Sequence, residues 1–334
     1  MPCPTLKREY DMKIPEYKSL QEKKEAFGNN YQRISTIAEL KLFLEETNSF
    51  VKYIYRGVCE AKYMNYTSAQ RRYIVNELSF VNIGDLIKKQ IDCIKEEHNQ
   101  LIDCYYKSLN ITPNDFLYLG IAQHYGGISP LLDFTIDLKT ALYFMIDGAC
   151  FPPQGTDEVG NYSSLYYIQT NCFIDYEKLL SEVSSTISMK LDSLFSNKEI
   201  DSNISNEDII DYLSSFDNFK DLGDKMGSDL YFLIPNKKKA QSIKIKGKNR
   251  MIKGVFTISN LNIAAQKGCF VFFLPKEQKK PLERPLHCVD IHKSLIPYIN
   301  EYIGLKKSDI YPNNNDIVKN AYNKALRSIL DEMK

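Results

Sequence analysis

The sequence predicts an α+β fold, with a mixed, mostly antiparallel sheet that is split in two halves and flanked by helices. Short runs rich in β-branched and aromatic residues recur along the chain, and several of them end at a glycine, a proline or a polar turn. Longer segments with apolar residues at helical spacing lie between these runs. Strands are expected near 50–56, 131–135, 164–170, 230–234, 254–259 and 269–274.

Helices are predicted where polar capping residues precede an amphipathic pattern. Ser35 and Thr36 precede a helix that begins near Ile37. Residues 68–108 carry a continuous apolar stripe among charges, which predicts helix over the whole range and a scaffold role. Further helices are expected at 291–303 and from about Asp316.

Composition predicts a soluble cytoplasmic protein. The 334 residues are 43% hydrophobic and 25% charged with a net charge of +1, so bulk charge does not indicate nucleic acid or a membrane surface. No apolar run reaches ~18 residues, and the polar N-terminus lacks the apolar centre of a secretion signal. The eight cysteines are scattered without a CxxC or CxxH pair, which favours free thiols over a metal site.

The chain is expected to divide into three parts. Residues 1–33 are polar with charges of both signs, which predicts an N-terminal extension. The main domain is predicted at 34–275, with a helical insertion at about 171–222 that is rich in Ser, Asn and Asp. Residues 276–334 are predicted to be a C-terminal helical extension.

Residues 116–145 form the most unusual stretch, because polar groups gather at two turns of an otherwise apolar run. Gln, His and Tyr at 123–125 precede a glycine pair, and Asp133 and Thr135 belong to the strand that follows. Taken singly, His124 is compatible with a core histidine, and Asp133 and Thr135 are compatible with helix caps. Together they predict a site, since a plain core segment has little need of so many polar groups.

Two basic features lie outside that stretch. Arg56 follows aromatic residues at the end of an early strand; such an arginine is usually solvated, but its planar fork also suits phosphate or carboxylate. Residues 236–254 hold eight basic residues and no acidic one. A solvated basic hairpin is the first interpretation of this segment, and a nucleic-acid or other phosphate-rich partner is the alternative.

Three blocks of sequence match one pattern. They are Tyr55-Arg56-Gly57; Ala-Gln-His-Tyr-Gly at 122–126 with Leu-Leu-Asp-Phe-Thr at 131–135 and Ala-Leu-Tyr-Phe at 141–144; and Gln-Lys-Gly-Cys-Phe at 266–270. This pattern resembles the FRG domain family, named for its (F/Y)RG motif. The resemblance extends from about Ile37 to Leu274, and it assigns the predicted 34–275 domain to that family. The chain departs from it at Ile128-Ser129-Pro130, where the family usually has Pro-Thr-Arg.

The order of these motifs is similar to that of the ADP-ribosyltransferase fold. By that resemblance Arg56 would hold the phosphates or ribose of NAD, Thr135 would support the site, and Gln266 would occupy the region of the catalytic Glu. A Gln carries no negative charge to stabilise an oxocarbenium-like centre. Asp133 is then the best carboxylate and His124 the best proton carrier.

The resemblance therefore implies an ADP-ribosyltransferase-like enzyme that uses NAD as co-substrate, without a metal, to modify a protein or nucleic acid, as a bacterial toxin or anti-phage effector would. A non-catalytic nucleotide- or nucleic-acid-binding module is the alternative. A hydrolytic enzyme built on His124 has the least support, since no cysteine adjoins it. The predicted catalytic residues are His124, Asp133 and Gln266, and the predicted cofactor-binding residues are Tyr55, Arg56, Gly57, Gln123, Tyr125, Thr135 and Tyr143.

Overall fold

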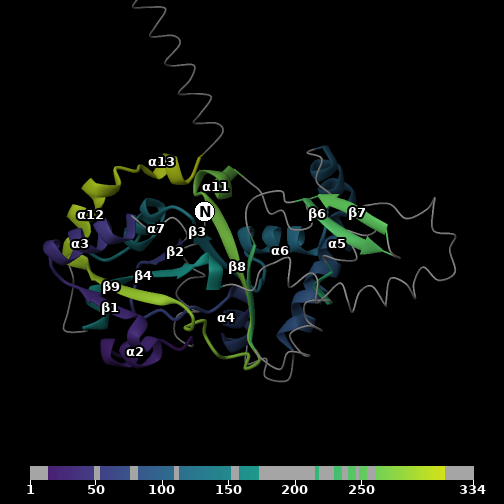
Figure 1. Cartoon of the computed structure of the whole chain (residues 1–334). Helices are drawn as coiled ribbons and strands as arrows, with labels where there is room; N and C mark the ends of the chain where they lie inside the picture. The colour runs from purple at the N-terminus through teal and green to yellow at the C-terminus, as the bar shows by residue number, and fades with distance from the viewer. Residues whose placement is uncertain are drawn as a thin grey trace, which may run out of the picture.

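The computed structural model describes residues 14–48, 53–75, 82–108, 113–151, 158–172, 215–217, 229–234, 240–245, 248–253 and 261–312. In this part of the chain a mixed sheet of seven strands lies at the centre, with helices on both sides (Figure 1). All neighbouring strands are antiparallel except the first pair, which is parallel. The predicted α+β class is therefore confirmed. Across the sheet the order is β1 (Tyr31–Ile34), β9 (His287–His292), β4 (Tyr162–Gln169), β2 (Tyr53–Val58), β3 (Leu131–Thr135), β8 (Gly268–Leu274) and β5 (Leu230–Ile234).

The sheet divides between β2 and β3. These strands are paired only at Tyr55 and Thr135, whereas β2 pairs with β4 along its whole length. One half of the sheet is therefore β1-β9-β4-β2, and the other is β3-β8-β5. The sequence predicted a sheet in two halves without locating the division, which the structure places between β2 and β3.

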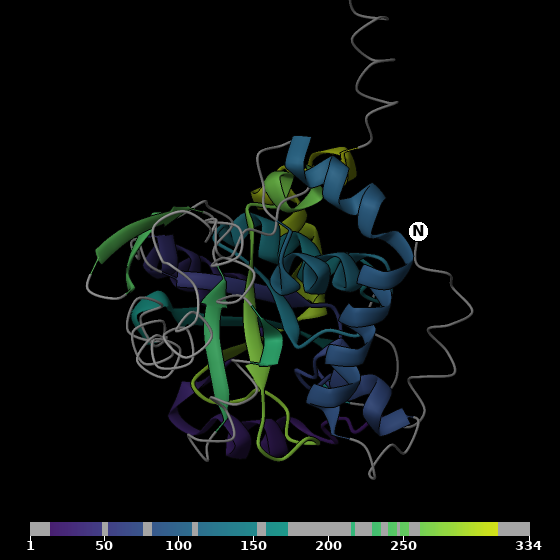
Figure 2. The same ribbon diagram turned by 90° about the vertical axis from the view of Figure 1, so that its right-hand side faces the viewer.

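The predicted strands at 131–135 and 230–234 coincide with β3 and β5, and those near 50–56, 164–170 and 269–274 correspond to β2, β4 and β8. The strand predicted at 254–259 and the helix predicted from Asp316 lie outside the described residues. The basic segment contains a separate antiparallel pair, β6 (Ala240–Ile245) and β7 (Lys248–Lys253), which Figure 2 shows at the side of the molecule opposite the long helix α5 (Ile83–Ser108).

The helix predicted at 291–303 is wrong over its first part. Strand β9 continues to His292, a 3-10 turn follows at Lys293–Leu295, and helix α12 spans Ile296–Ile303. The interior of β9 is buried throughout, so it lacks the alternation of a half-exposed strand. Ile291 also precedes Leu295 and Ile299 at helical spacing, and this imitates one continuous helix.

The continuous helix predicted at 68–108 is also wrong. Helix α4 spans Ser68–Val75, and α5 begins anew at Ile83. Asn82 caps the second helix, with its Oδ1 accepting from the backbone N of Gly84 at 2.7 Å. The other helices are α2 (Leu20–Phe27), α3 (Ile37–Asn48), α6 (Asp115–His124), α7 (Leu138–Ile146), α11 (Leu261–Ala265) and α13 (Lys307–Ile310), with 3-10 turns at Gly28–Asn30, Val159–Asn161 and Thr170–Cys172.

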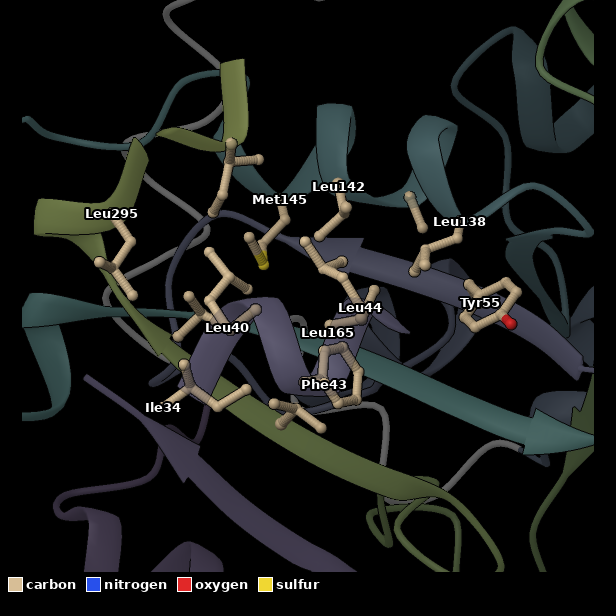
Figure 3. Packing of buried hydrophobic residues seen from close by; sticks show 14 of the residues in the cluster. Ile34, Leu40, Phe43, Leu44, Tyr55, Leu138, Leu142, Met145, Leu165 and Leu295 are labelled. Atoms are coloured by element: carbon tan, nitrogen blue, oxygen red, sulfur yellow. The ribbon is translucent and has the colours of Figure 1, made fainter. Parts of the chain in front are cut away.

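One face of the sheet is covered by α3, α7 and α12 (Figure 1). Side chains of α7 such as Leu142 and Met145 point toward those of α3 and of the strands below (Figure 3). Gly57 of β2 permits this packing, because a Cβ there would lie 1.9 Å from the carbonyl oxygen of Ala141 in α7. Burial of these apolar side chains is the main stabilising contribution on this face.

The opposite face carries a second apolar cluster and α2. Lys23 of α2 is fully buried there and pairs with Asp290 of β9 at 2.6 Å. Its Nζ also donates to the Oγ of Ser164 and the backbone oxygen of Ala61, and Tyr31 donates to the other carboxylate oxygen of Asp290. We call this group the Lys23 cluster.

The sheet includes strands from both segments that the sequence places outside the main domain. Strand β1 begins at Tyr31, and β9 begins at His287. They pair with each other in parallel at one edge of the sheet. The three-part division of the chain stays a prediction. In the structure both outer segments contribute residues to strands of the central sheet. No helix in the described residues is long and apolar enough to cross a membrane.

Candidate functional site

Arg56 lies at the point where the sheet divides. Its neighbour Tyr55 faces α7, so strand alternation directs Arg56 to the opposite face. Its Nε donates to the Oδ1 of Asn65 at 3.3 Å, and its Nη1 donates to the backbone oxygen of Asp133 at 2.9 Å. The half-buried guanidinium thus joins β2 to β3 beyond the last backbone pair.

The charge of Arg56 has no carboxylate partner within the residues that the structure describes: both of its hydrogen bonds go to neutral oxygens. Burial lowers the pKa of the guanidinium, and the charge of Asp133 acts in the opposite direction. An arginine remains protonated under such conditions. N–H groups of the fork that are not used by these two acceptors remain able to bind an anion.

Asp133 contacts this arginine through its backbone oxygen, and the charge of its carboxylate acts on the guanidinium. It is the exposed residue of β3, between the buried Leu132 and Phe134. The Nε2 of Gln123, on α6, donates to its Oδ2 at 3.0 Å. The Oε1 of Gln123 accepts in turn from the Oγ of Ser68 at 3.4 Å. A neutral amide therefore orients the carboxylate without supplying a positive charge.

Asn65 completes this group. It lies in the loop after β2 and is 2% exposed. Its Oδ1 accepts from Arg56, while its Nδ2 is buried and has no hydrogen-bond partner in the described part of the chain. We call Arg56, Asn65, Gln123 and Asp133 the Arg56 cluster.

The turn between α6 and β3 is held by polar side chains of neighbouring helices. The Nε2 of Gln90 donates to the backbone oxygen of Ile128 at 2.8 Å, and its Oε1 accepts from the nitrogen of the same residue at 2.8 Å. The Oγ of Ser68 accepts from the nitrogen of Ser129 at 2.9 Å. These bonds position Gln123 relative to Asp133 from the scaffold helices α4 and α5.

Tyr55 and Thr135 form the single pair that joins the two halves of the sheet. Tyr55 is 4% exposed in the core beneath α7, where burial, with smaller contributions from Tyr53 and Tyr167, raises the pKa of its phenol to about 12. The Oγ1 of Thr135 donates to the backbone oxygen of Gln266 at 2.7 Å. Both side chains are used for packing or for backbone contacts.

Gln266 and Tyr143 face the C-terminal segment. The Nε2 of Gln266 donates to the backbone oxygen of Ile310 at 3.2 Å. The ring of Tyr143, on α7, contacts the rings of Phe144 and Tyr311 edge to face. Neither side chain has a contact with the Arg56 cluster.

The remaining predicted residues have different surroundings. Tyr125 is 86% exposed. His124 is the last residue of α6, and its side chain lies outside the described part of the structure. Gly57 provides space for α7, as described above. Of the predicted site residues, Arg56 and Gln123 both contact Asp133. Thr135 pairs with Tyr55 and contacts the backbone of Gln266.

Asn65 and Ser68 were not predicted. Asn65 precedes Thr67, whose Oγ1 accepts from the nitrogen of Gln70 and whose own nitrogen donates to the Gln70 side chain. In sequence this polar run has the signature of a helix N-terminus. That signature accounts for the run without indicating that Asn65 also contacts Arg56. The one available signal was its position soon after the Tyr-Arg-Gly block.

Chemically, the cluster combines a cation that forms no ion pair in the described residues with the exposed carboxylate of the residue whose backbone oxygen it contacts. Such a pair suits a ligand that carries both an anionic group and a hydroxyl-bearing or cationic part. Among the described residues, no group of three or more His, Cys, Asp and Glu gathers as a metal site.

Comparison with known proteins identifies one family. The family model of the FRG domain matches residues 51–150. This range includes β2, α6, β3 and α7, and therefore Arg56, Gln123 and Asp133. The resemblance inferred from the sequence motifs is confirmed for this part of the chain. No curated protein and no solved structure matches the chain.

Proposed function

We propose that the protein is an ADP-ribosyltransferase-like enzyme that binds NAD through its FRG domain and transfers ADP-ribose to a protein or nucleic-acid acceptor. The observation that supports this best is the guanidinium of Arg56, which forms no ion pair in the described residues and donates to the backbone oxygen of Asp133. The similarity of motif order to the ADP-ribosyltransferase fold and the division of the sheet between β2 and β3 agree with it.

The reaction assigns a role to each group. The bond between C1′ of the ribose and the nicotinamide nitrogen breaks, and nicotinamide leaves as a neutral molecule with the bonding electrons. The carboxylate of Asp133 stabilises the positive charge that develops on the ribose, as carboxylates do in glycoside chemistry. A nucleophile of the acceptor then forms a bond to C1′ and releases a proton, for which His124 is the proposed carrier.

Arg56 supplies binding in this scheme. Its fork holds the negatively charged phosphates and places the ribose near Asp133. Gln266 is not given a chemical role, because its amide is bound to the backbone of Ile310. Modification of a cellular protein or nucleic acid in this way is the activity of a toxin or an anti-phage effector, which is the biological role we propose.

Labelled NAD and a cell lysate test this proposal. We expect label transfer by the wild type, a fall of about 10²-fold or more for Asp133→Asn, and weaker NAD binding for Arg56→Ala and Arg56→Lys. Asp92→Asn and Arg33→Ala are matched controls, since both residues form ion pairs at partly or fully exposed positions. The proposal fails if the wild type neither consumes NAD nor transfers label and Arg56→Ala behaves as the wild type does.

A second candidate function is nucleic-acid binding without catalysis. It is favoured by the basic composition of 236–254 and by the β6–β7 hairpin, which does not pair with the seven-stranded sheet. RNA or DNA retention should then fall steeply with salt. Charge reversal at Lys244, Lys246 and Lys248 should abolish it, while leaving NAD consumption unchanged if both functions are present.

A further inference from the structure

We propose that Asn65 and Arg56 together form one binding site for a phosphoryl oxyanion, and that the natural occupant is the pyrophosphate of the dinucleotide. The second part rests on the function proposed above. Asn65 belongs to none of the sequence motifs, and its two amide atoms have different surroundings.

The hydrogen-bond chemistry fixes the orientation of the Asn65 amide. The Nε of Arg56 can only donate, so the atom 3.3 Å from it must be the carbonyl oxygen Oδ1. The atom without a partner is therefore the donor Nδ2, and not an acceptor assigned to the wrong side of the amide.

Only three buried side-chain polar atoms lack a hydrogen bond in the described residues, and Nδ2 of Asn65 is the one donor. Of the other two, Oδ1 of Asp115 has Lys95 at 2.6 Å, and Oδ1 of Asn161 is an acceptor in a 3-10 turn. A buried donor without an acceptor is costly and rare in native proteins. Here the unpaired Nδ2 belongs to the residue that accepts from the guanidinium of Arg56, which has no ion-pair partner in the described residues. Both groups are donors that an anionic acceptor would satisfy.

The set of free groups selects an oxyanion. Arg56 and Asn65 offer only N–H donors toward a ligand, because Oδ1 of the amide is already bonded to Arg56. The nearby carboxylate of Asp133 is bonded to Gln123 through Oδ2, and Arg56 takes only its backbone oxygen. A pyrophosphate has enough oxygens to accept hydrogen bonds from both the guanidinium of Arg56 and the Nδ2 of Asn65. The bond to Nδ2 would form away from water, where hydrogen bonds are stronger.

Asn65→Asp is the first of two variants that test this site. It keeps an acceptor for the Nε of Arg56, replaces Nδ2 by a second oxygen, and gives Arg56 a counter-ion. The new carboxylate also neutralises Arg56, so anion binding should weaken in this variant whether or not Nδ2 contacts the ligand. Asn65→Ala removes Nδ2 without adding a charge, so unchanged pyrophosphate binding in Asn65→Ala overturns the inference. The proposal predicts a folded protein whose affinity for inorganic pyrophosphate and for NAD, measured by calorimetry, falls by about 10-fold or more.

Gln169→Glu is the matched control. Gln169, on β4, donates its Nε2 to the hydroxyl of Tyr53 at 2.6 Å. The same amide-to-carboxylate change is thus made on the strand that pairs with β2. Its affinity for pyrophosphate should stay within about 2-fold of wild type, since bulk charge alone has a small effect at physiological salt. Asn65→Ala is measured in parallel, with thermal unfolding of every variant, so that a misfolded Asn65→Asp does not leave the question open.

The outcomes separate this inference from the proposed function. Loss of both pyrophosphate and NAD binding in the folded Asn65 variants supports both. Wild-type binding of pyrophosphate but not NAD, with loss in the variants, supports the oxyanion site and overturns its occupant. Unchanged NAD and pyrophosphate binding in Asn65→Ala overturns the inference while the proposed function stands. A wild type that binds neither ligand overturns both.

Discussion

Two basic side chains lie close together on the same face of the sheet but differ in burial and in whether a carboxylate pairs with their charge. Lys23 is fully buried and bonded to Asp290, Ser164 and a backbone oxygen. Arg56 is half-buried and bonded only to neutral oxygens. The two are near neighbours, because Arg56 pairs with Tyr166 in the sheet and the Nζ of Lys23 lies 5.5 Å from the centre of that ring.

The difference separates a structural charge from one that is available for a ligand. Burial acts to lower the pKa of Lys23, and the groups around it, including Asp290, outweigh that effect, so this pKa lies above its usual range. The Lys23 cluster is thus a closed ion pair that joins α2 to β9. The Arg56 cluster retains an unpaired donor and an exposed carboxylate, which is how a binding site differs from a structural contact.

The largest effect is expected from breaking the closed pair. Asp290→Ala leaves Lys23 charged and buried, which should lower the free energy of unfolding by about 3–5 kcal/mol. Urea unfolding followed by circular dichroism measures this loss. The double variant Lys23→Met/Asp290→Ala removes both charges and should recover much of it. A loss below about 1 kcal/mol for the single variant would contradict the structural assignment.

A smaller effect on stability is expected at the open cluster. Arg56→Met removes the guanidinium and leaves neutral acceptors without a donor, so the loss should be about 1–2 kcal/mol in the same experiment. The same change should abolish pyrophosphate binding. If Arg56→Met destabilised the protein as strongly as Asp290→Ala, the contrast between the two clusters would disappear.

The contact between Gln123 and Asp133 gives an intermediate test of function. Gln123→Glu would place a like charge against the carboxylate and displace it, because the 3.0 Å hydrogen bond would be lost. We expect transfer activity to fall by about 10-fold or more while pyrophosphate binding changes little. Gln21→Glu, at an exposed position on α2, is the control for the added charge. An equal fall in both variants would argue against a positioning role for Gln123.

The open cluster was largely predictable from the sequence, and the closed one was not. Arg56, Gln123 and Asp133 lie at strand ends and turns within dense local motifs, and such positions indicate a site before any contact is known. Lys23 lies in a short charged helix that has the pattern of a solvated surface, and its partner is 267 residues away. Sequence spacing carries no information about an ion pair of that kind.

Two further differences have local causes. Gln266 was correctly placed just before β8, but a position at an element boundary does not determine side-chain direction, and its amide bonds to Ile310. Strand β9 is buried on both faces, so its apolar residues merge with the helical pattern that follows. In both cases the deciding contact comes from a segment distant in sequence, which a local pattern does not contain.

The smallest expected effect is on the pH dependence of stability. It involves His287 of β9 and leaves the Arg56 cluster unaffected. His287 stacks on Tyr167 with ring centres 4.7 Å apart, and burial lowers the pKa of its imidazole. The folded protein then binds fewer protons than the unfolded chain, so this contribution to stability is fully present above the usual value of 6.5 and is lost as the pH falls below it. Stability should fall below pH 6.5 through this group in the wild type, and His287→Phe should remove that fall while matching the wild-type slope at pH 8. Pyrophosphate binding should be the same in His287→Phe and wild type across this range, and a change in binding would mean that strand β9 and the Arg56 cluster are not independent.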